Sequence, residues 1–385
     1  MPTESRAVDI VLLGVTGFTG GLIADYLAAH APASLTVALA GRDPARLDDV
    51  VTRTNGRFEA VTVDATDPVG LRDLTARSRV LITTVGPYLL HGDPVVAACA
   101  DTGTDYLDLT GESEFADLTY LKHHRRALST GARLIHACGF DSVPHDLGAQ
   151  FTVEQLPEGV PLEVRGYVTM RGTFSGGTAA SALEIMSRRG QGRTTQSIRR
   201  QIEPEPEGRT VTVATGRIGR HPSTGSWVVP APTIDPLIVA ESARQLERYG
   251  PDFTYSHFIA TGGPLATAAS LGGVGALFVA AQIPPARRTL GRLRPPGSGP
   301  TPEQRAQAWF NVRFTGEGGG RTVTTEVAGG DPGYTETSKM ISEAALSLAV
   351  DDLPPTAGQV TTASALGPAL RTRLQSAGIT FTVLD

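Results

Sequence analysis

The stretch "LLGVTGFTGGLIADYL", residues 12–27, joins an apolar run to a helical pattern through a turn that carries three glycines. The run before the turn, "VDIVLLG" (8–14), has the β-branched and apolar composition of a buried strand. In residues 20–30, after the turn, apolar side chains recur at the spacing of one helical face. The stretch therefore predicts a strand, a tight turn and a helix in immediate succession.

The three glycines have the spacing G-x-x-G-x-x-G, which suits a dinucleotide-binding turn. Gly14 permits the tight turn, Gly17 lets the backbone approach a pyrophosphate, and Gly20 lets the helix pack close to the sheet. The free N–H groups at the start of the helix then face the phosphates. The residues of this turn predicted to contact a dinucleotide are Gly14, Thr16, Gly17, Phe18, Thr19 and Gly20.

The second strand, "SLTVALAG" (34–41), favours NADP(H) over NAD(H). NAD sites usually place an acidic residue at the end of this strand to hold the ribose 2′-hydroxyl. Here Ala40 and Gly41 occupy that place, and Arg42 follows with a guanidinium that can bind a 2′-phosphate. Asp43 is expected to cap the next helix, which begins with Pro44. The alternative for Arg42 is an exposed, solvated side chain.

Two further strand ends supply candidate cofactor contacts. Asp64 closes the third strand, where it either faces the adenine or caps a helix. The fourth strand ends in "TTVGPYLLHGDP", and ligands of doubly wound sheets lie beyond the carboxyl ends of the strands. The residues expected beside the ribose and nicotinamide are Thr84, Val85, Gly86 and Pro87.

Strand-like and helix-like segments alternate through the first 140 residues, which predicts an α/β fold with a Rossmann-type doubly wound parallel sheet. A chain of 385 residues is long for one core, so two domains are expected. We assign 1–148 to a dinucleotide-binding domain and 149–334 to a second, α+β domain for substrate binding or dimerisation. Its sheet is predicted from 162–172 and from a hairpin over 308–329, and a helix is predicted over 175–190.

Composition excludes several classes of protein. The net charge of −5 argues against a nucleic-acid-binding protein, which usually carries a basic excess. The two cysteines, Cys99 and Cys138, cannot form a disulfide framework and lack the spacing of a metal site. Cys138 is expected to be a buried apolar group and not a nucleophile. The first ten residues lack a signal-peptide pattern, so a cytoplasmic location is expected.

Residues 258–286 contain no charged side chain and are followed by the basic stretch "RRTLGRLR". The segment is almost long enough to cross a bilayer, but alanine, glycine and threonine dominate it. A buried helix or helix pair is the favoured interpretation. A lipid-facing or acyl-channel surface, with peripheral membrane contact, is the second, and a membrane span is the third.

Several motifs together resemble the saccharopine dehydrogenase-like oxidoreductases, and among them the actinobacterial trans-acting enoyl reductases. The motifs are "GVTGFTG", "AGR", "TTVGPYLLHGDPVVAACADTGTDYLDLTGE", "CGFDSVPHDLG" and "GGDPGYTETSKMISEAALSLA". The resemblance covers nearly the whole chain and is weak over 190–250. Relatives usually read F-D-S-[VI]-P-S-D, and this chain has His145 in place of the second serine. The change implies either an altered substrate or proton path, or a tolerated surface substitution.

The resemblance implies an NADPH-dependent reductase that reduces an α,β-unsaturated acyl thioester, carried by a polyketide synthase or acyl carrier, in polyketide or lipid biosynthesis. It also implies that residues 335–385 pack back on the dinucleotide domain. The alternatives are a reductase or dehydrogenase of an imine, ketone or amino-acid adduct, and a non-catalytic NADP-binding, lipid-associated protein. A homodimer is left open, and no metal is expected.

The chemistry is expected between the rims at 84–88 and 138–145, because both follow strands at the same edge of the sheet. Enoyl reduction needs a proton donor as the enolate forms. Tyr88 is the favoured donor because its hydroxyl is neutral at pH 7. Asp141 and His145 are the other candidates, and all three could instead be structural.

Overall fold

The computed structural model describes residues 6–172, 187–221, 224–231, 233–283 and 299–384. Its first sheet is built from β1 (Val8–Leu13), β2 (Val37–Gly41), β3 (Glu59–Thr62), β4 (Ser78–Thr83), β5 (Asp105–Leu107), β6 (Arg133–Ile135) and β14 (Gly358–Val360). These seven strands are parallel and lie in the order β14-β6-β5-β4-β1-β2-β3. The predicted α/β fold with a doubly wound parallel sheet is therefore confirmed.

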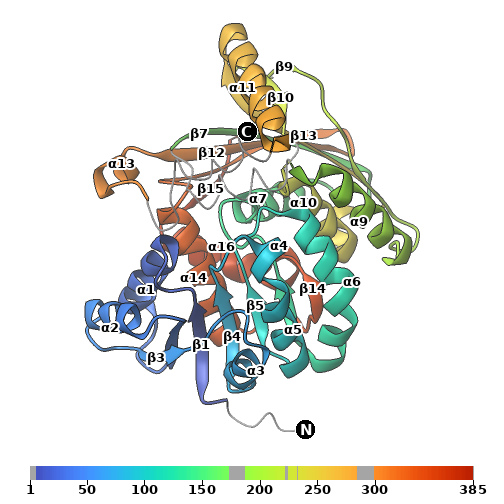
Figure 1. The fold of residues 1–385 in the computed structure, drawn as a ribbon. Coiled ribbons are helices and arrows are strands. Elements are labelled where there is room, and N and C mark those ends of the chain that lie inside the picture. Colours follow the sequence, from blue (N-terminus) through green and yellow to red (C-terminus); the bar gives the residue numbers. More distant parts are fainter. Residues whose placement is uncertain (1–5, 173–186, 222–223, 232, 284–298, 385) are drawn as a thin grey trace.

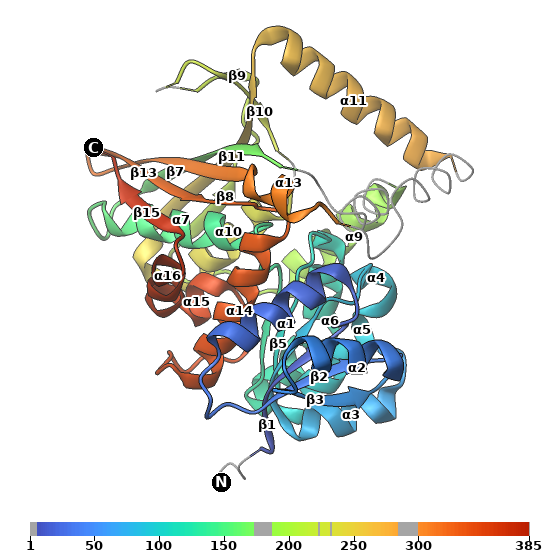
Figure 2. The ribbon, with the colours of Figure 1, turned by 90° about the vertical axis from the view of Figure 1, so that its left-hand side faces the viewer.

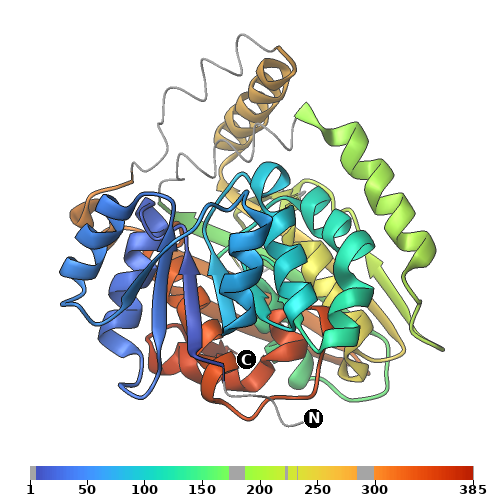
Figure 3. The same cartoon turned by 60° about the horizontal axis from the view of Figure 1, so that its bottom comes forward.

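Helices cover both faces of this sheet (Figures 1 and 3). They are α1 (Phe18–His30), α2 (Pro44–Arg53), α3 (Pro68–Ala76), α4 (Tyr88–His91), α5 (Asp93–Thr102), α6 (Ser113–Thr130) and α14 (Thr335–Val350). Alternate side chains of β1 enter different cores: Ile10 packs with residues of α1, α2 and α14, whereas Val11 packs with residues of α3 and α5. A strand buried on both faces explains why "VDIVLL" is an apolar run without alternation.

The predicted start of α2 is confirmed in detail. The Asp43 carboxylate accepts a hydrogen bond from the Arg46 N–H at 3.2 Å, and Pro44 occupies the first helical position. The Asp43 side chain is therefore occupied as a helix cap.

The second sheet has eight strands: β7 (Leu162–Arg171), β8 (Thr210–Val213), β9 (Gly219–Arg220), β10 (Trp227–Pro230), β11 (Asp252–Gly262), β12 (Trp309–Gly318), β13 (Arg321–Gly329) and β15 (Thr380–Val383). The order is β15-β13-β12-β7-β11-β10-β9, with β8 also paired to β11. As predicted, β12 and β13 form a hairpin, and β7 lies beside it.

Several helices lie between or beside the two sheets: α7 (Val143–Glu154), α9 (Arg189–Ile202), α10 (Asp235–Gln245), α13 (Pro302–Ala306), α15 (Thr362–Ala365) and α16 (Gly367–Ser376), with a 3-10 turn η1 (Glu247–Tyr249). One continuous core joins the two sheets: Ile135 of β6, Leu147 of α7 and Phe314 of β12 belong to it. The helix predicted over 175–190 falls mostly outside the described residues.

The C-terminal segment divides between the two sheets. α14 packs on α1 and β4, and β14 extends the first sheet, as expected for a segment that completes the dinucleotide domain. β15 instead pairs with β13 in the second sheet. The expectation that all of 335–385 joins the first domain is thus wrong for its last strand, which finds its hydrogen-bond partners at the free edge of β13.

The uncharged segment is not a buried helix. Residues up to Gly262 complete β11. Pro264–Gln282 form α11, which projects away from the body of the molecule (Figure 2). Only Thr267 and Ala281 are buried among its residues. The favoured interpretation of 258–286 as a buried helix or helix pair is therefore wrong.

Candidate active site

The glycine turn has the shape that a dinucleotide requires. Gly14 adopts a φ of +89°, and a Cβ there would lie 2.7 Å from Thr84 Oγ1, so only glycine fits. A Cβ on Gly20 would lie 2.4 Å from the Gly14 carbonyl oxygen. Gly17 precedes the first turn of α1 and supplies no side-chain cap, so N–H groups of that turn remain available for phosphate oxygens. The turn therefore fits the pyrophosphate of NADP(H).

The segment after β4 lies against this turn. The Thr84 N–H donates to the Leu13 carbonyl at 3.0 Å, and its hydroxyl donates to the Gly14 carbonyl at 3.1 Å. Val85 and Pro87 are partly exposed and Gly86 is exposed at this edge of the sheet. Cofactor contact by these four residues and by the glycine turn remains a prediction.

The remaining residues of the turn are tied to other parts of the chain. The Thr16 carbonyl accepts a hydrogen bond from Arg46 at 2.7 Å. The Phe18 ring packs edge-on against Tyr334, with 4.9 Å between centroids, and Arg305 lies 5.6 Å above it. Thr19 is partly exposed in the first turn of α1.

Two guanidinium groups and one carboxylate follow β2 and β3 at the same edge. Arg42 is exposed directly after β2, and Arg46, which the sequence analysis missed, reaches this edge from α2. Asp64 accepts hydrogen bonds from the N–H and hydroxyl of Thr66 at 2.8 and 2.7 Å. These bonds, with a smaller contribution from Arg42, lower the pKa of Asp64. The cap of α3 is Asp67, so the alternative of Asp64 as a helix cap is wrong.

We expect Arg42→Ala to remove most of the preference for NADPH over NADH. Loss of a charge-assisted contact to the 2′-phosphate predicts roughly a ten- to hundredfold weaker NADPH affinity, with NADH affinity unchanged. Fluorescence titration with both cofactors measures this. Arg72→Ala, an exposed arginine of α3, is the matched control. Equal losses for NADPH and NADH would contradict the assignment.

Tyr88 is held as a structural residue and not as a proton donor. Its hydroxyl donates to the Thr83 carbonyl and accepts from the Leu109 N–H, both at 3.2 Å. The side chain is buried and packs against Phe115. Burial raises the pKa of Tyr88 well above its ordinary value. Because both hydroxyl functions are engaged by backbone groups, the expectation of Tyr88 as the favoured donor is not supported by this geometry.

We therefore expect Tyr88→Phe to reduce stability and spare catalysis. The substitution leaves the Leu109 N–H and the Thr83 carbonyl without this partner, which costs about 1–3 kcal/mol. Turnover should stay within about threefold of wild type, since no transition-state contact is lost. Urea unfolding and steady-state kinetics measure the two quantities. A tenfold loss of kcat with unchanged stability would return Tyr88 to the mechanism.

A buried network accounts for much of the block from Val85 to Glu112. The Asp108 carboxylate accepts hydrogen bonds from Tyr106 Oη and from the N–H groups of Thr110 and Ala137, at 2.9–3.0 Å, and lies 2.7 Å from His136 Nδ1. Glu112 accepts from the N–H groups of Tyr88 and Leu89. These acids satisfy backbone donors at the ends of β4, β5 and β6 and shape the rim where ligands bind.

A second buried group lies where the first domain meets the second sheet. His145 in the first turn of α7 has its Nδ1 3.0 Å from Asp235 Oδ1, at the start of α10. The His145 and His257 rings lie 4.9 Å apart, and Tyr255 Oη lies 3.1 Å from His257 Nδ1. His145 is 2% exposed. His145 is therefore not a surface substitution, so that alternative is wrong.

The charges of this group depend on burial and on each other. Burial, followed by the negative charge of Asp235, raises the pKa of Asp141 to about 7, and His145 opposes the shift. Burial is the largest influence on Asp235 and would raise its pKa. His145 and His257 outweigh it, so the pKa of Asp235 is lowered. Burial lowers the pKa of His257 to about 4, so this ring is neutral at pH 7.

Two polar atoms of the 138–145 rim, the Ser142 hydroxyl and His145 Nε2, are buried without a hydrogen-bond partner within the described part of the chain. His145 Nδ1 contacts Asp235 at 3.0 Å, but that contact is not aligned as a hydrogen bond. Asp141 is partly exposed beside them. Buried polar groups normally form hydrogen bonds, so the unpaired hydrogen-bonding atoms here fit a polar ligand. Cys138 is buried, as expected, and burial raises its pKa well above the ordinary value.

Asp141 and His145 were predictable from the sequence, whereas Asp235, Tyr255 and His257 were not predicted from it. The available signal was the histidine in "YSHF" (255–258), inside a stretch with the alternation of a strand. Asp235 falls in a region of weak pattern, and nothing in its neighbours marked it.

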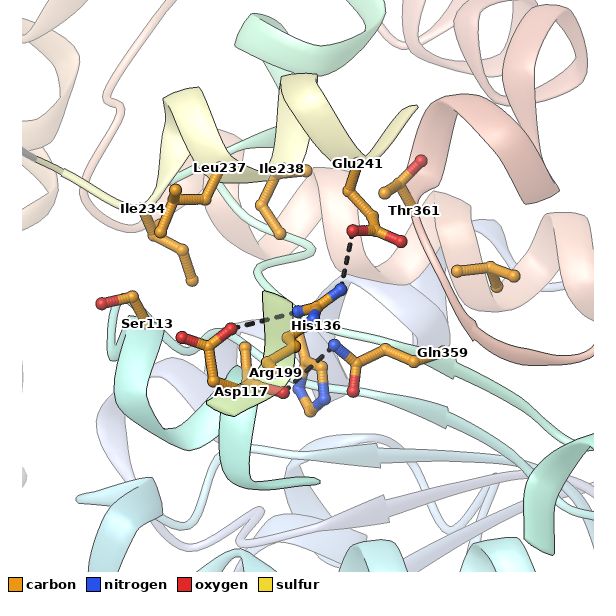
Figure 4. Close-up of a pocket in the computed structure, with 12 residues that line it drawn as sticks. Ser113, Asp117, His136, Arg199, Ile234, Leu237, Ile238, Glu241, Gln359 and Thr361 are labelled. Carbon is orange, nitrogen blue, oxygen red and sulfur yellow. Dashed lines mark hydrogen bonds and ion pairs between the residues drawn. The ribbon is translucent and has the colours of Figure 1, made fainter. Parts of the chain in front are cut away.

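A small pocket of about 20 Å³, large enough for one water molecule, lies beside this region (Figure 4). Arg199 of α9 crosses it and pairs with Asp117 at 3.2 Å and with Glu241 at 2.6 Å. Its size and its internal ion pairs make it a structural junction of α6, α9 and α10, too small for an acyl substrate.

Comparison with known proteins agrees with this geometry. The family described as "Saccharopine dehydrogenase NADP binding domain" matches residues 10–135. The chain is 34% identical to the trans-acting enoyl reductase of Mycobacterium tuberculosis and 32% identical to that of Mycobacterium ulcerans, each over 98% of both chains. It is 37% identical, with the same coverage, to Rv2449c of Mycobacterium tuberculosis, whose name assigns it provisionally to that class.

The solved structure of saccharopine dehydrogenase (L-Glu forming) from Saccharomyces cerevisiae shares the fold. The similarity covers 98% of this chain and 100% of that chain with a TM-score of 0.57, at 13% identity. The matched domain and the full-length relatives make the protein an NADP-dependent oxidoreductase, as predicted. The chain belongs to the saccharopine dehydrogenase-like oxidoreductases, the family that includes the mycobacterial trans-acting enoyl reductases.

Proposed function

We propose that this NADPH-dependent reductase reduces the carbon–carbon double bond of an α,β-unsaturated acyl thioester carried by a separate synthase or acyl carrier in the cytoplasm. The observation that carries the proposal is the similarity to trans-acting enoyl reductases over 98% of both chains. The buried acid–base group at the 138–145 rim supports it, because the reaction needs a proton donor and a stabilised oxyanion.

NADPH, when bound, supplies the hydride that reaches the β-carbon of the substrate. Asp141 is the proton donor in this proposal: its carboxyl proton goes to the α-carbon, and the carboxylate regains a proton from water. A pKa of about 7 leaves a substantial fraction of Asp141 protonated at neutral pH. As a residue Asp141 is partly exposed at the rim, and burial of its carboxyl group raises the pKa.

His145 stabilises the thioester oxygen in this proposal. Its Nδ1 side faces Asp235, which stays ionised because its pKa is lowered. In this proposal Nδ1–H donates to the Asp235 carboxylate, and Nε2–H, which has no partner among the described residues, donates to the oxygen where enolate charge develops. The neutral His257 ring, held beside Tyr255, fixes the position of the His145 ring from the second sheet.

The test is NADPH oxidation with a panel of substrates. We expect turnover of 2-enoyl thioesters on coenzyme A, on pantetheine or on an acyl carrier protein, with mass spectrometry showing a gain of two hydrogens. Ketones, imines and amino-acid adducts should give rates at least a hundredfold lower. Faster reduction of an imine or a ketone would overturn the proposal that the substrate is an enoyl thioester, but the protein would still be an NADPH-dependent reductase. NADPH binding without turnover of any substrate would favour a non-catalytic protein.

A further inference from the structure

α11 is an apolar helix that stands outside the core. Its 19 residues contain no charged side chain, and among the described residues it is the one helix long and apolar enough to cross a membrane. Core helices of soluble proteins can have the same composition, but such helices are buried. Here all nine residues from Ala268 to Ala276 are exposed.

The exposure extends around the helix. Leu265, Leu271, Val274 and Val279 are 86%, 45%, 57% and 60% exposed and point in different directions around the axis. A Cβ added at Gly272, Gly273 or Gly275 would meet no atom within 4 Å. Its main contacts with other described elements are with β10 and β11. A helix that docks on a protein groove usually has one apolar face and one polar face, and this helix has no polar face.

The connections of α11 exclude a full crossing. It follows β11 and leads to α13 and β12, and β11 and β12 lie in the same sheet. Gly299 lies against the Phe18 ring, on the body of the molecule. A helix across the bilayer would force residues 284–298 to cross back. Their sequence carries Arg287, Arg288, Arg292 and Arg294, and arginine is among the costliest residues to place in hydrocarbon.

We infer that α11 lies in the interfacial region of a lipid bilayer and holds the enzyme at the membrane surface. Acyl chains can surround a helix that is apolar on all sides, whereas water cannot solvate it favourably. The inference concerns binding and is independent of the substrate proposed above.

The experiment is flotation of the full-length protein with vesicles of phosphatidylcholine and one-quarter phosphatidylglycerol. The test variant is Leu271→Glu/Val274→Glu, which places two charges in the middle of α11. The matched control is Val69→Glu/Leu128→Glu, at residues 69% and 51% exposed on α3 and α6. NADPH titration and thermal unfolding confirm that each variant is folded.

We expect wild type and control to float with the vesicles, and the α11 variant to partition at least tenfold less. Sedimentation of the protein without lipid measures its oligomeric state, which shows whether α11 binds a second copy of the chain instead of a membrane. A wild-type protein that fails to float would overturn the inference. If that protein were also an oligomer that the α11 variant dissociates, the helix would bind a second copy of the chain. Equal flotation of wild type and α11 variant would likewise overturn it.

Discussion

Asp141→Asn is expected to lower kcat by about 10²–10⁴-fold while NADPH affinity stays within about twofold of wild type. General acid catalysis contributes a factor of this size, and the amide cannot donate an equivalent proton. Asp141 is the ionisable group of the rim that is both partly exposed and substantially protonated at pH 7. Stopped-flow measurement of NADPH oxidation under saturating enoyl thioester separates the chemical step from binding.

The pH dependence provides a second readout of the same residue. A donor with a pKa of about 7 is protonated below that pH, so wild-type kcat should fall as the pH rises through about 7. The residual activity of Asp141→Asn should show no such fall. A variant that keeps wild-type turnover, or the wild-type pH profile, would remove Asp141 from the mechanism.

The same substitution should stabilise the protein at alkaline pH. The pKa of Asp141 is raised above its unfolded value near 4, so the native state holds the proton more tightly. Ionisation therefore costs stability progressively as the pH rises from about 4 through 7. At pH 8 Asp141→Asn removes the cost of ionising this carboxyl group in the native state. That cost is about 2–4 kcal/mol, at 1.36 kcal/mol per unit of pKa. Urea unfolding at pH 5 and pH 8 measures the gain. Asp73→Asn, at an exposed position of α3, should change little.

Arg199→Met is expected to lower the free energy of unfolding by about 3–5 kcal/mol at pH 8. The guanidinium is 8% exposed and pairs with Asp117, Glu203 and Glu241 at 3.2, 2.7 and 2.6 Å. Methionine fills much of the volume but, among the described residues, leaves the three carboxylates with only the more distant Arg244, 3.8 Å from Glu241. Breaking a buried ion pair in this way is strongly destabilising. Arg200→Met, the exposed neighbour on α9, should stay within about 0.5 kcal/mol of wild type.

The loss of unfolding free energy caused by Arg199→Met should be smaller at lower pH. Burial already raises the pKa of Glu241 to about 7 and raises that of Asp117, and loss of the arginine raises both further. Protonation below about pH 6 then removes the uncompensated negative charge. Urea unfolding at pH 5.5 and pH 8 tests this. A deficit that is the same at both pH values would indicate lost packing in place of lost charge compensation.

The sequence by itself determined the first domain and its cofactor. The turn at Gly14, Gly17 and Gly20 works through backbone geometry, and the cap at Asp43 works through neighbours three residues apart. The missing acid after the second strand is likewise visible in adjacent residues. Local interactions of this kind leave a pattern in the chain, which is why the strands, the helices and NADP(H) could be predicted. The hairpin of β12 and β13 was predictable for the same reason.

The tertiary structure decided the features that depend on contacts distant in the chain. Tyr88 is a plausible donor until Leu109 and Thr83 engage its hydroxyl. The surroundings of the His145 ring come from Asp235 and His257, which lie about 90 and 110 residues further along the chain. The last strand pairs with β13 of the second sheet, a choice that the local sequence does not record. The composition of α11 is the same for a core helix and a membrane-facing one. Only the absence of other described elements around its middle turns distinguishes them, because burial is a property of the surroundings and not of the helix.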